Sequence, residues 1–460
     1  MVHQKFYAYF LFYFLIICGV IHAEEDTYKK RPQHTSSIIN EHYIHPRTKY
    51  NFVVYMSAAN DLWPFADRNI EQMKRIGSNE HLNILVHLDI HRPGSKKTTK
   101  KLFIQKNKII QIGQSTALDS GDENTLINTM TWIEDHFPAD HMILVFWNHG
   151  SGDINPLKWK TVDPSTFFTY NSQNKLIELD RSTSFFETLD AGSLYERGVC
   201  FDETTGNYLN DKKLKRALTE ICAHRKKKID LIYFDACLMA GMGTVWLVHF
   251  FADYMTASEE LVLGTGADYS KILPPLRDGI ITPEELSKHI VRCYEKTYAH
   301  ITHDYTQSAF NLNKFTALSH NVDTLAQLFI HALKNQKNNS IKKFIKDSKS
   351  KFVCTHFGDN QPTYIDLCHF YKNMLSKIST LELQDLNETS ILKQDLKTLL
   401  EEGLSIVSTV IIANAVGKNL KNAGGIYIYF PEKSIHPSFA STEFAENNHW
   451  STFLIEYINS

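Results

Sequence analysis

Short apolar segments along the first half of the chain constrain its fold more than any other feature of the sequence. They read YNFVVYM, NILVHLD, MILVFW and IDLIYFD, at residues 50–56, 83–89, 142–147 and 229–235. Stretches with helical periodicity follow or lie between them, at residues 64–76, 123–136 and 210–224. Strands that are apolar on both faces and alternate with helices form a largely parallel sheet covered on both sides. The sequence therefore predicts an α/β fold.

The rest of the chain divides around this core. Two short strands at 102–105 and 109–112 predict a hairpin at one edge of the sheet, and a length of 460 residues exceeds one compact core. Residues after 270 are mainly helical, with an amphipathic helix expected over 443–457. We expect a signal peptide at 1–23, a polar linker or pro-segment at 24–48, an α/β domain at 49–270 and a mainly helical C-terminal region at 271–460 with a late strand at 424–430.

The N-terminus predicts export. Lys5 precedes about 16 apolar residues, FYAYFLFYFLIICGVI, and His22-Ala23 then leads into the polar EEDTYKK. A basic start, an apolar segment and a small residue at the cleavage point describe a secretory signal. The apolar segment is shorter than the roughly 20 residues of a membrane-spanning helix, although a retained anchor is the alternative. We therefore expect a secreted, periplasmic or cell-surface protein with no stable membrane span after signal removal.

Charge and cysteine content exclude several other classes. The formal net charge of −2 gives no reason to expect nucleic acid as a partner. The cysteines are widely spaced and form no CxxC pair, so they indicate neither a disulfide framework nor a zinc site. A single disulfide, such as Cys354 with Cys368, remains compatible with an exporting compartment. The sequence contains nothing that fixes the oligomeric state.

Reactive residues directly follow two of the predicted strands. His149 lies in NHGSG after the strand at 142–147, and Cys237 lies in DACLMA after the strand at 229–235. Ligand sites of parallel sheets lie at the carboxyl ends of the strands, so both residues should share one rim. A helix beginning near Leu238 would favour the thiolate form of Cys237. A cysteine in this context is nevertheless more often an inert core residue than a nucleophile.

These motifs, with several others, resemble the clostripain family of cysteine peptidases, which shares the caspase-like fold with gingipains and legumain. VVYMSAANDLWPFADRNIEQM is similar to the family's opening strand and helix, and FPADHMILVFWNHGSG to its histidine strand. RGVCFDETTGNYLNDKKLKRAL, FADYMTASEE, GGIYIYFP and HWSTFLIEY resemble later parts of the family, so the resemblance spans roughly residues 50 to 457. It implies a caspase-like, mostly parallel sheet flanked by helices.

The resemblance also implies roles for the two reactive residues. Cys237 would be the nucleophile and His149 the general acid and base, acting through a thioester acyl-enzyme. Gly150 would let a substrate carbonyl approach the backbone, and the backbone N–H groups of Gly150 and Cys237 could form an oxyanion hole. A peptide or protein is then the expected substrate.

Specificity is expected to depend on Asp235. In the family, the aspartate two residues before the nucleophile receives a basic P1 side chain, whereas an aspartate here could equally cap the following helix. The segment SEELVLGTGADY departs from the family pattern, because Thr265 stands where we expect a second acidic residue and Ala267 where we expect an aromatic one. Asp268 is a candidate substitute for the missing carboxylate. Cleavage after Arg or Lys is therefore expected, without a strict requirement.

Residues 153–196 lie between His149 and Cys237 and show no clear periodicity, so we interpret them as an insertion. In the family this region is cut during activation, which predicts autoprocessing here. If the specificity is basic, the candidate sites are Lys158, Lys160, Lys175 and Arg181. A plain surface loop is the alternative.

Metal chemistry receives less support. His87-Leu-Asp-Ile-His91 could place three ligands on one strand face, but Asp89 and His91 fall at the strand end and no fourth ligand is evident. Asp89 is more consistent with support of the sheet rim. The family resemblance leaves a calcium site open, yet no DxDxDG loop is present and no ligands can be assigned. The expected chemistry needs no cofactor.

Three functions are compatible with these residues. An exported cysteine endopeptidase is the leading hypothesis. A transamidase or ligase would use the same dyad but admit an amine in place of water. A catalytically inactive caspase-like binding protein is the third, and the presence of both His149 and Cys237 argues against it.

Overall fold

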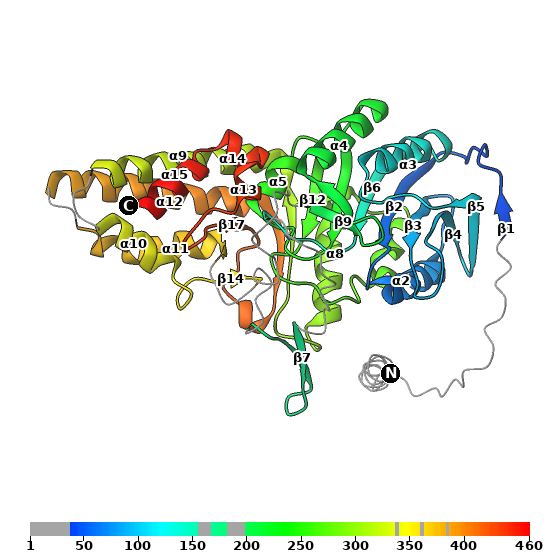
Figure 1. The fold of residues 1–460 in the computed structure, drawn as a ribbon, viewed down its shortest axis with the longest axis horizontal. Coiled ribbons are helices and arrows are strands. Elements are labelled where there is room, and N and C mark those ends of the chain that lie inside the picture. Colours follow the sequence, from blue (N-terminus) through cyan, green and yellow to red (C-terminus); the bar gives the residue numbers. More distant parts are fainter. Residues whose placement is uncertain (1–36, 155–166, 182–197, 336–339, 359–362, 383–385) are drawn as a thin grey trace. The chain divides into compact units, whose positions relative to one another are not determined.

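A single ten-stranded sheet runs through the computed structural model, which describes residues 37–154, 167–181, 198–335, 340–358, 363–382 and 386–460 (Figure 1). The strand order is β1-β5-β4-β3-β2-β6-β11-β12-β13-β16. The bounds are β1 Ser37–Ile39, β2 Thr48–Ala58, β3 Leu82–Ile90, β4 Thr98–Gln105, β5 Lys108–Thr116, β6 Ala139–Trp147, β11 Ile229–Asp235, β12 Ala252–Ala257, β13 Thr306–Asn311 and β16 Ile411–Val416.

The five central strands, β3, β2, β6, β11 and β12, are parallel to one another. In β3, β2, β6 and β11 the side chains are mostly apolar on both faces and almost all buried, which is why helices must cover the sheet on both sides. The strands β4 and β5 form the predicted antiparallel hairpin, and β1 extends it as a parallel partner of β5. The predicted α/β fold with a mostly parallel sheet is therefore confirmed.

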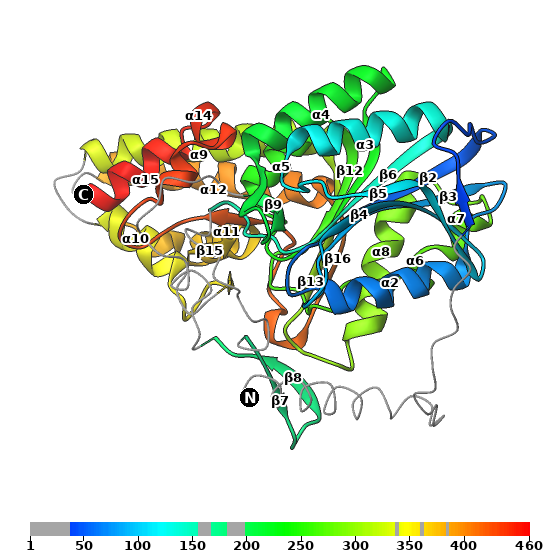
Figure 2. The ribbon, with the colours of Figure 1, turned by 45° about the vertical axis from the view of Figure 1, so that its right-hand side comes forward.

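Helices form the two outer layers. Figure 2 shows α3 and α4 together on one side of the sheet, and α2, α6 and α8 on the other. Apolar residues of the first group belong to one buried cluster, and those of the second group to another. The bounds are α2 Trp63–Ile76, α3 Glu123–His136, α4 Asp211–Arg225, α5 Met242–Val248, α6 Tyr269–Ile272, α7 Pro274–Arg277 and α8 Pro283–Tyr298.

Residues beyond 270 are mainly helical, but they also supply β13 and β16 to the main sheet. The helices beyond residue 314 share the buried cluster that includes α3 and α4, so one core continues into this region, whereas α8 belongs to the other cluster. The helices are α9 Phe315–Asn335, α10 Ser340–Lys349, α11 Leu367–Lys377, α12 Leu386–Val410, α13 Pro437–Ala440, α14 Glu443–Asn447 and α15 Trp450–Asn459. A small antiparallel sheet contains β14 His356–Phe357, β15 Tyr364–Asp366 and the late strand β17 Tyr427–Tyr429.

Two elements differ from the sequence-based expectation, and one is added to it. The added element is β1, which lies in the segment 24–48 that we expect to be a polar linker or pro-segment. The helix expected over 443–457 is two helices, because Asn448 is extended (φ −138°, ψ 139°) and its side chain caps the backbone N–H of Trp450. The helix expected from Leu238 begins at Met242, because Leu238 has φ 60° and residues 238–241 pass against the ring of Tyr427.

Residues 167–181 of the expected insertion form a hairpin of β7 Phe168–Asn171 and β8 Leu176–Leu179. It contacts the body of the protein at Ile177, whose backbone N–H donates to Ile301 O at 2.8 Å. A second hairpin follows, with β9 Gly198–Asp202 and β10 Asn207–Asn210.

The expected signal peptide lies outside the described residues. Within the described ranges, no helix has the length and apolar character needed to cross a bilayer. The six cysteines of the described residues are free thiols, so Cys354 and Cys368 are not joined by a disulfide.

Candidate active site

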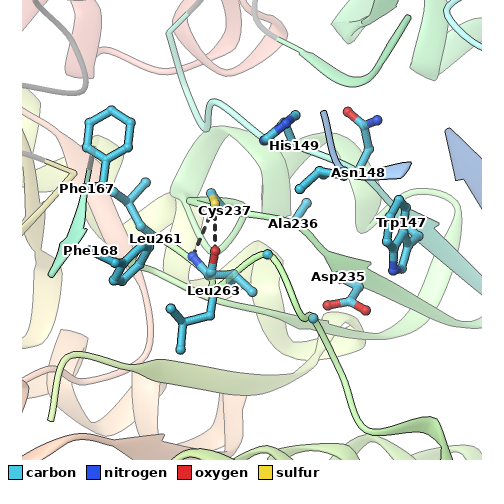
Figure 3. A pocket seen from close by; sticks show the side chains of 14 residues that line it. Trp147, Asn148, His149, Phe167, Phe168, Asp235, Ala236, Cys237, Leu261 and Leu263 are labelled. Carbon is cyan, nitrogen blue, oxygen red and sulfur yellow. Dashed lines mark hydrogen bonds between the residues drawn. The ribbon is translucent and has the colours of Figure 1, made fainter. Parts of the chain in front are cut away.

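Two adjacent strands deliver His149 and Cys237 to the same rim of the sheet. Trp147, the last residue of β6, pairs with Asp235, the last residue of β11. His149 and Cys237 each follow two residues later, so the matched register places them side by side beyond the strand ends. Both line one pocket together with Asp235 (Figure 3). The structure thus brings together three of the residues that the sequence singled out.

The loop that follows β11 requires a glycine at position 150. A Cβ at this position would lie 2.4 Å from the carbonyl oxygen of Cys237 and 2.9 Å from the sulfur of Met239. We expected this glycine to admit a substrate carbonyl, but the group that approaches it here is the carbonyl of Cys237 itself. The close approach holds the His149 loop against the Cys237 loop.

Sequence reasoning missed Asp61, which holds His149. The His149 Nε2 and Asp61 Oδ1 atoms are 2.6 Å apart, and the two side chains are 13% and 14% exposed. With Nε2–H donated to the carboxylate, Nδ1 carries the lone pair. Asp61 follows β2, the parallel neighbour of β6, so the rule that rim residues gather at strand ends could have identified it.

Charges around His149 favour its protonated form. Burial alone would lower the pKa of His149, but the charge and hydrogen bond of Asp61, with a contribution from Glu203, raise that pKa above its ordinary value. Glu203 lies just beyond β9, and its backbone N–H donates to Ala59 O at 3.0 Å. Burial and the charge of Asp61 raise the pKa of Glu203 to about 7. The imidazole therefore has two carboxyl groups close to it.

The surroundings of Cys237 favour its neutral thiol form. Burial raises the pKa of Cys237 to about 12, and the backbone N–H of Val262 donates to its sulfur at 3.2 Å. We expected a helix N-terminus beside Cys237 to favour its thiolate, but α5 begins only at Met242, five residues beyond Cys237 in the chain. Nucleophilic attack by this thiol therefore requires a base that removes its proton.

Asp235 lies at the opposite end of the pocket from the phenylalanine side chains (Figure 3). Its carboxylate accepts hydrogen bonds from Ala267 N at 3.2 and 3.1 Å and from the Tyr269 hydroxyl at 2.8 Å. Burial raises the pKa of Asp235 to about 6. These partners, together with the later start of α5, show that Asp235 does not cap that helix.

The other two expected specificity residues have different surroundings. Thr265 Oγ1 lies 2.7 Å from the Tyr298 hydroxyl, and Asp268 caps α6 through Ser270 N and pairs with Lys271 at 3.1 Å. Neither residue lines the pocket. Among the described residues that do line it, Asp235 alone carries a carboxylate.

The candidate cleavage residues are distributed between described and undescribed segments. Lys158 and Lys160 lie outside the described residues. Lys175 is in the turn of the β7–β8 hairpin with φ 59°. Arg181 is held by Glu260, with its guanidinium nitrogen 2.8 Å from the carboxylate, and its more distant neighbour Asp304 lies at 3.9 Å.

The three residues considered as metal ligands point to separate partners. His87 stacks on the ring of Tyr55, and His91 Nε2 donates to Ser95 O at 3.2 Å. Asp89 supports the sheet rim through an ion pair with Lys97 at 3.0 Å. No cluster of three or more metal-ligating side chains occurs within the described part of the chain.

Two stacked tyrosines from the small C-terminal sheet support both catalytic-rim loops, and sequence reasoning did not identify them. The Tyr364 and Tyr427 rings are 4.3 Å apart at an interplanar angle of 17°. The Tyr427 hydroxyl donates to Leu238 O at 2.6 Å, and the Tyr364 hydroxyl donates to Ser151 O at 2.9 Å. One tyrosine therefore supports the loop after Cys237 and the other the loop after His149.

Comparison with known proteins gives a consistent assignment. The chain matches the clostripain family model over residues 54–180 and 187–456. A secreted C11 cysteine protease from Bacteroides thetaiotaomicron, solved with an irreversible peptide inhibitor, is 18% identical, with a TM-score of 0.58 over 88% of this chain and 99% of that chain. An inactive zymogen C11 protease from Parabacteroides distasonis is 16% identical, with a TM-score of 0.57 over 89% of this chain and 99% of that chain. No curated protein matches the chain.

The family model accounts for most of the chain, including both strands that end at the pocket and the tyrosine strand near the C-terminus. The two solved proteases share its fold over nearly nine-tenths of its length. The chain therefore belongs to the clostripain family of cysteine peptidases, as the resemblance of its motifs predicted.

Proposed function

We propose that this peptidase is an exported endopeptidase that uses Cys237 as nucleophile and His149 as acid and base, and that it cleaves after Arg or Lys. The observation that carries the proposal is the matched register of β6 and β11, which places both side chains on one pocket beside a buried carboxylate. The N-terminal apolar segment supports export.

The chemistry follows from the protonation states. His149 Nδ1 accepts the thiol proton as Cys237 Sγ attacks the scissile carbonyl carbon, and Asp61 stabilises the resulting imidazolium. The backbone N–H groups of Gly150 and Cys237 are the proposed donors to the oxyanion. The intermediate collapses when His149 gives its proton to the leaving amine and the C–N bond breaks. Water then attacks the thioester and releases the acid and the thiol.

Asp235 gives the pocket its preference for a cation. A guanidinium or ammonium group that reaches this carboxylate gains a charge-assisted hydrogen bond in a site largely shielded from water. Thr265 stands where we expect a second acidic residue, so the preference for a cationic P1 side chain depends on one carboxylate. Uncharged P1 side chains should therefore be disfavoured less than in a pocket with two carboxylates. We also propose that processing occurs within 153–196, and that Arg181 is a poorer candidate than the exposed Lys175 because Glu260 holds its side chain.

The nucleophile is tested by comparing the wild-type chain with Cys237→Ala and with Cys222→Ala, a matched control at a partly buried thiol on α4. Peptides with Arg at P1 should be cleaved by the wild type and the control only, and intact mass should reveal a cut within 153–196 in the same two proteins. Equal cleavage by Cys237→Ala would refute the assignment.

Specificity is tested with two peptides that differ only in Arg or citrulline at P1, because citrulline keeps the shape and removes the charge. We expect the Arg peptide to have the higher kcat/KM at pH 8, and the ratio to fall as the pH drops through about 6, where Asp235 becomes protonated. Taking the ratio cancels the titration of His149. A ratio that does not change with pH would contradict the role of Asp235.

A further inference from the structure

The β7–β8 hairpin places aromatic side chains on the pocket. Phe167 and Phe168 line it together with Leu261, and they lie on the far side of Cys237 from Asp235 and Trp147 (Figure 3). Phe167 is 4% exposed and belongs to the buried core, whereas Phe168 is only partly buried and packs against that core. Phe168 therefore presents apolar surface to the pocket, while the neighbouring Phe167 is anchored in the core.

The hairpin is tied to the body of the protein by contacts on its second strand. Ile177 bonds to the backbone at Ile301, and the backbone N–H of Leu179 donates to Asp304 Oδ2 at 3.3 Å. Arg181 pairs with Glu260, whose side chain is fully buried. The residues that flank the two strands are also joined, since Asp180 N donates to Phe167 O at 2.7 Å. These contacts lie within the hairpin and the body, so a cut in the flanking segments would leave them intact.

We propose that Phe168 and Leu261 form an apolar subsite for the P2 side chain of the substrate, with a preference for large apolar residues such as leucine or phenylalanine. The proposal rests on the proposed function, which fixes the orientation of the peptide. The P1 side chain reaches toward Asp235 and the leaving amine faces His149, so the acyl side of the peptide turns toward the remaining wall, where Phe168 and Leu261 lie. Burial of an apolar side chain against this wall supplies affinity and selectivity.

The test compares peptides with Leu-Arg and Gly-Arg before the cleaved bond, using the full chain. The wild type should cleave the Leu-Arg peptide with a kcat/KM at least about tenfold higher. Phe168→Ala should bring this ratio toward one. Tyr170→Ala is the control and should keep the wild-type ratio. Tyr170 lies on the same strand, but its side chain is 41% exposed and does not line the pocket. A second peptide pair, with Leu or Gly at P1′, should show no effect of Phe168→Ala.

Two kinetic results would overturn the proposal. If Phe168→Ala raises cleavage of both peptides equally, the hairpin covers the pocket and does not bind substrate. If the variant alters only the P1′ pair, the peptide runs in the opposite direction. A binding measurement separates this proposal from the proposed function. The Kd values of the same peptides are measured for Cys237→Ala and for the double variant Cys237→Ala/Phe168→Ala. A lost Leu-Arg preference in Kd supports the subsite even where the wild-type chain cleaves nothing, whereas unchanged Kd values refute the subsite whatever the activity.

Discussion

At the scale of single residues, the pocket contains a thiol and an imidazole whose pKa values are both raised, for opposite reasons. Burial disfavours the charged form of Cys237, whereas the charge of Asp61 favours the charged form of His149. In the proposed mechanism, the surroundings of Cys237 therefore oppose transfer of the proton from sulfur to nitrogen, and those of His149 assist it. Asp61 also contacts Nε2 of His149, so the proposed base toward the thiol is Nδ1. We infer that Asp61 is a positioning residue whose effect on rate is exerted through His149.

Asp61→Asn tests this role. The amide keeps the size of the side chain but removes its charge and can donate to Nε2, which would place the proton on Nδ1. We expect kcat to fall by about 10²-fold or more with little change in KM. Loss of the negative charge lowers the pKa of His149, so the acidic limb of the kcat/KM profile should move to lower pH. The measurement is a pH–rate series on variants whose thermal unfolding confirms that they are folded.

Asp67→Asn is the matched control for Asp61→Asn. Asp67 lies on α2 and pairs at 2.6 Å with Arg92 in a site that is about 40% exposed, so its loss should change neither kcat nor the pH profile. A fall in kcat/KM of Asp61→Asn that comes entirely from KM, with the acidic limb in its original position, would contradict the positioning role.

At the scale of elements, the sequence predicts those parts of the site that depend on local patterns. The strands β6 and β11 are apolar on both faces and end in polar motifs, so their identity and the common rim of His149 and Cys237 follow from sequence alone. The strand-end rule also places Asp61 on this rim, but its pairing with His149 depends on contacts across the sheet. The φ of 60° at Leu238 depends on packing against Tyr427. The β7–β8 hairpin has a short alternation in a polar surrounding, too weak a pattern to separate from a loop.

The hairpin should depend on Arg181 for its attachment. In Arg181→Ala, the buried carboxylate of Glu260 loses its ion pair and keeps only hydrogen bonds from backbone N–H groups. An unpaired buried charge is unfavourable, so the attachment of the hairpin should weaken. We expect digestion by a chymotrypsin-type protease within 167–181 to become about tenfold faster. A Cys237→Ala background prevents self-cleavage. Lys175→Ala, in the hairpin turn, is the control and should leave the digestion rate unchanged; equal acceleration in both variants would show that Arg181 is not the anchor.

At the scale of the whole molecule, the C-terminal region contributes to the site as well as to the fold. It supplies two strands to the main sheet, and its small sheet carries the stacked pair Tyr364 and Tyr427. Each hydroxyl donates to a backbone carbonyl in one of the two loops that follow β6 and β11. A Cβ at Gly152 or at Gly241 would come within 2.5 Å of Tyr427, so the tyrosine fits closely against both loops. The relative position of His149 and Cys237 therefore depends on two tyrosines that lie 189 and 213 positions beyond the carbonyl groups they bind.

Tyr427→Phe separates this positioning role from a general contribution to stability. The variant keeps the stacked ring but leaves Leu238 O without its hydroxyl donor, which should lower the free energy of unfolding by about 1–3 kcal/mol. Because Leu238 follows the proposed nucleophile directly, we also expect kcat to fall by about tenfold. KM for a P1 Arg peptide should change little, since Asp235 is held by Ala267 and Tyr269.

Tyr371→Phe is the control. It removes a comparable buried hydrogen bond, from the Tyr371 hydroxyl to Asn321 Oδ1 at 2.9 Å, and should lower the stability of the protein without lowering kcat. Equal losses of kcat in the two variants would show that the tyrosines only stabilise the fold.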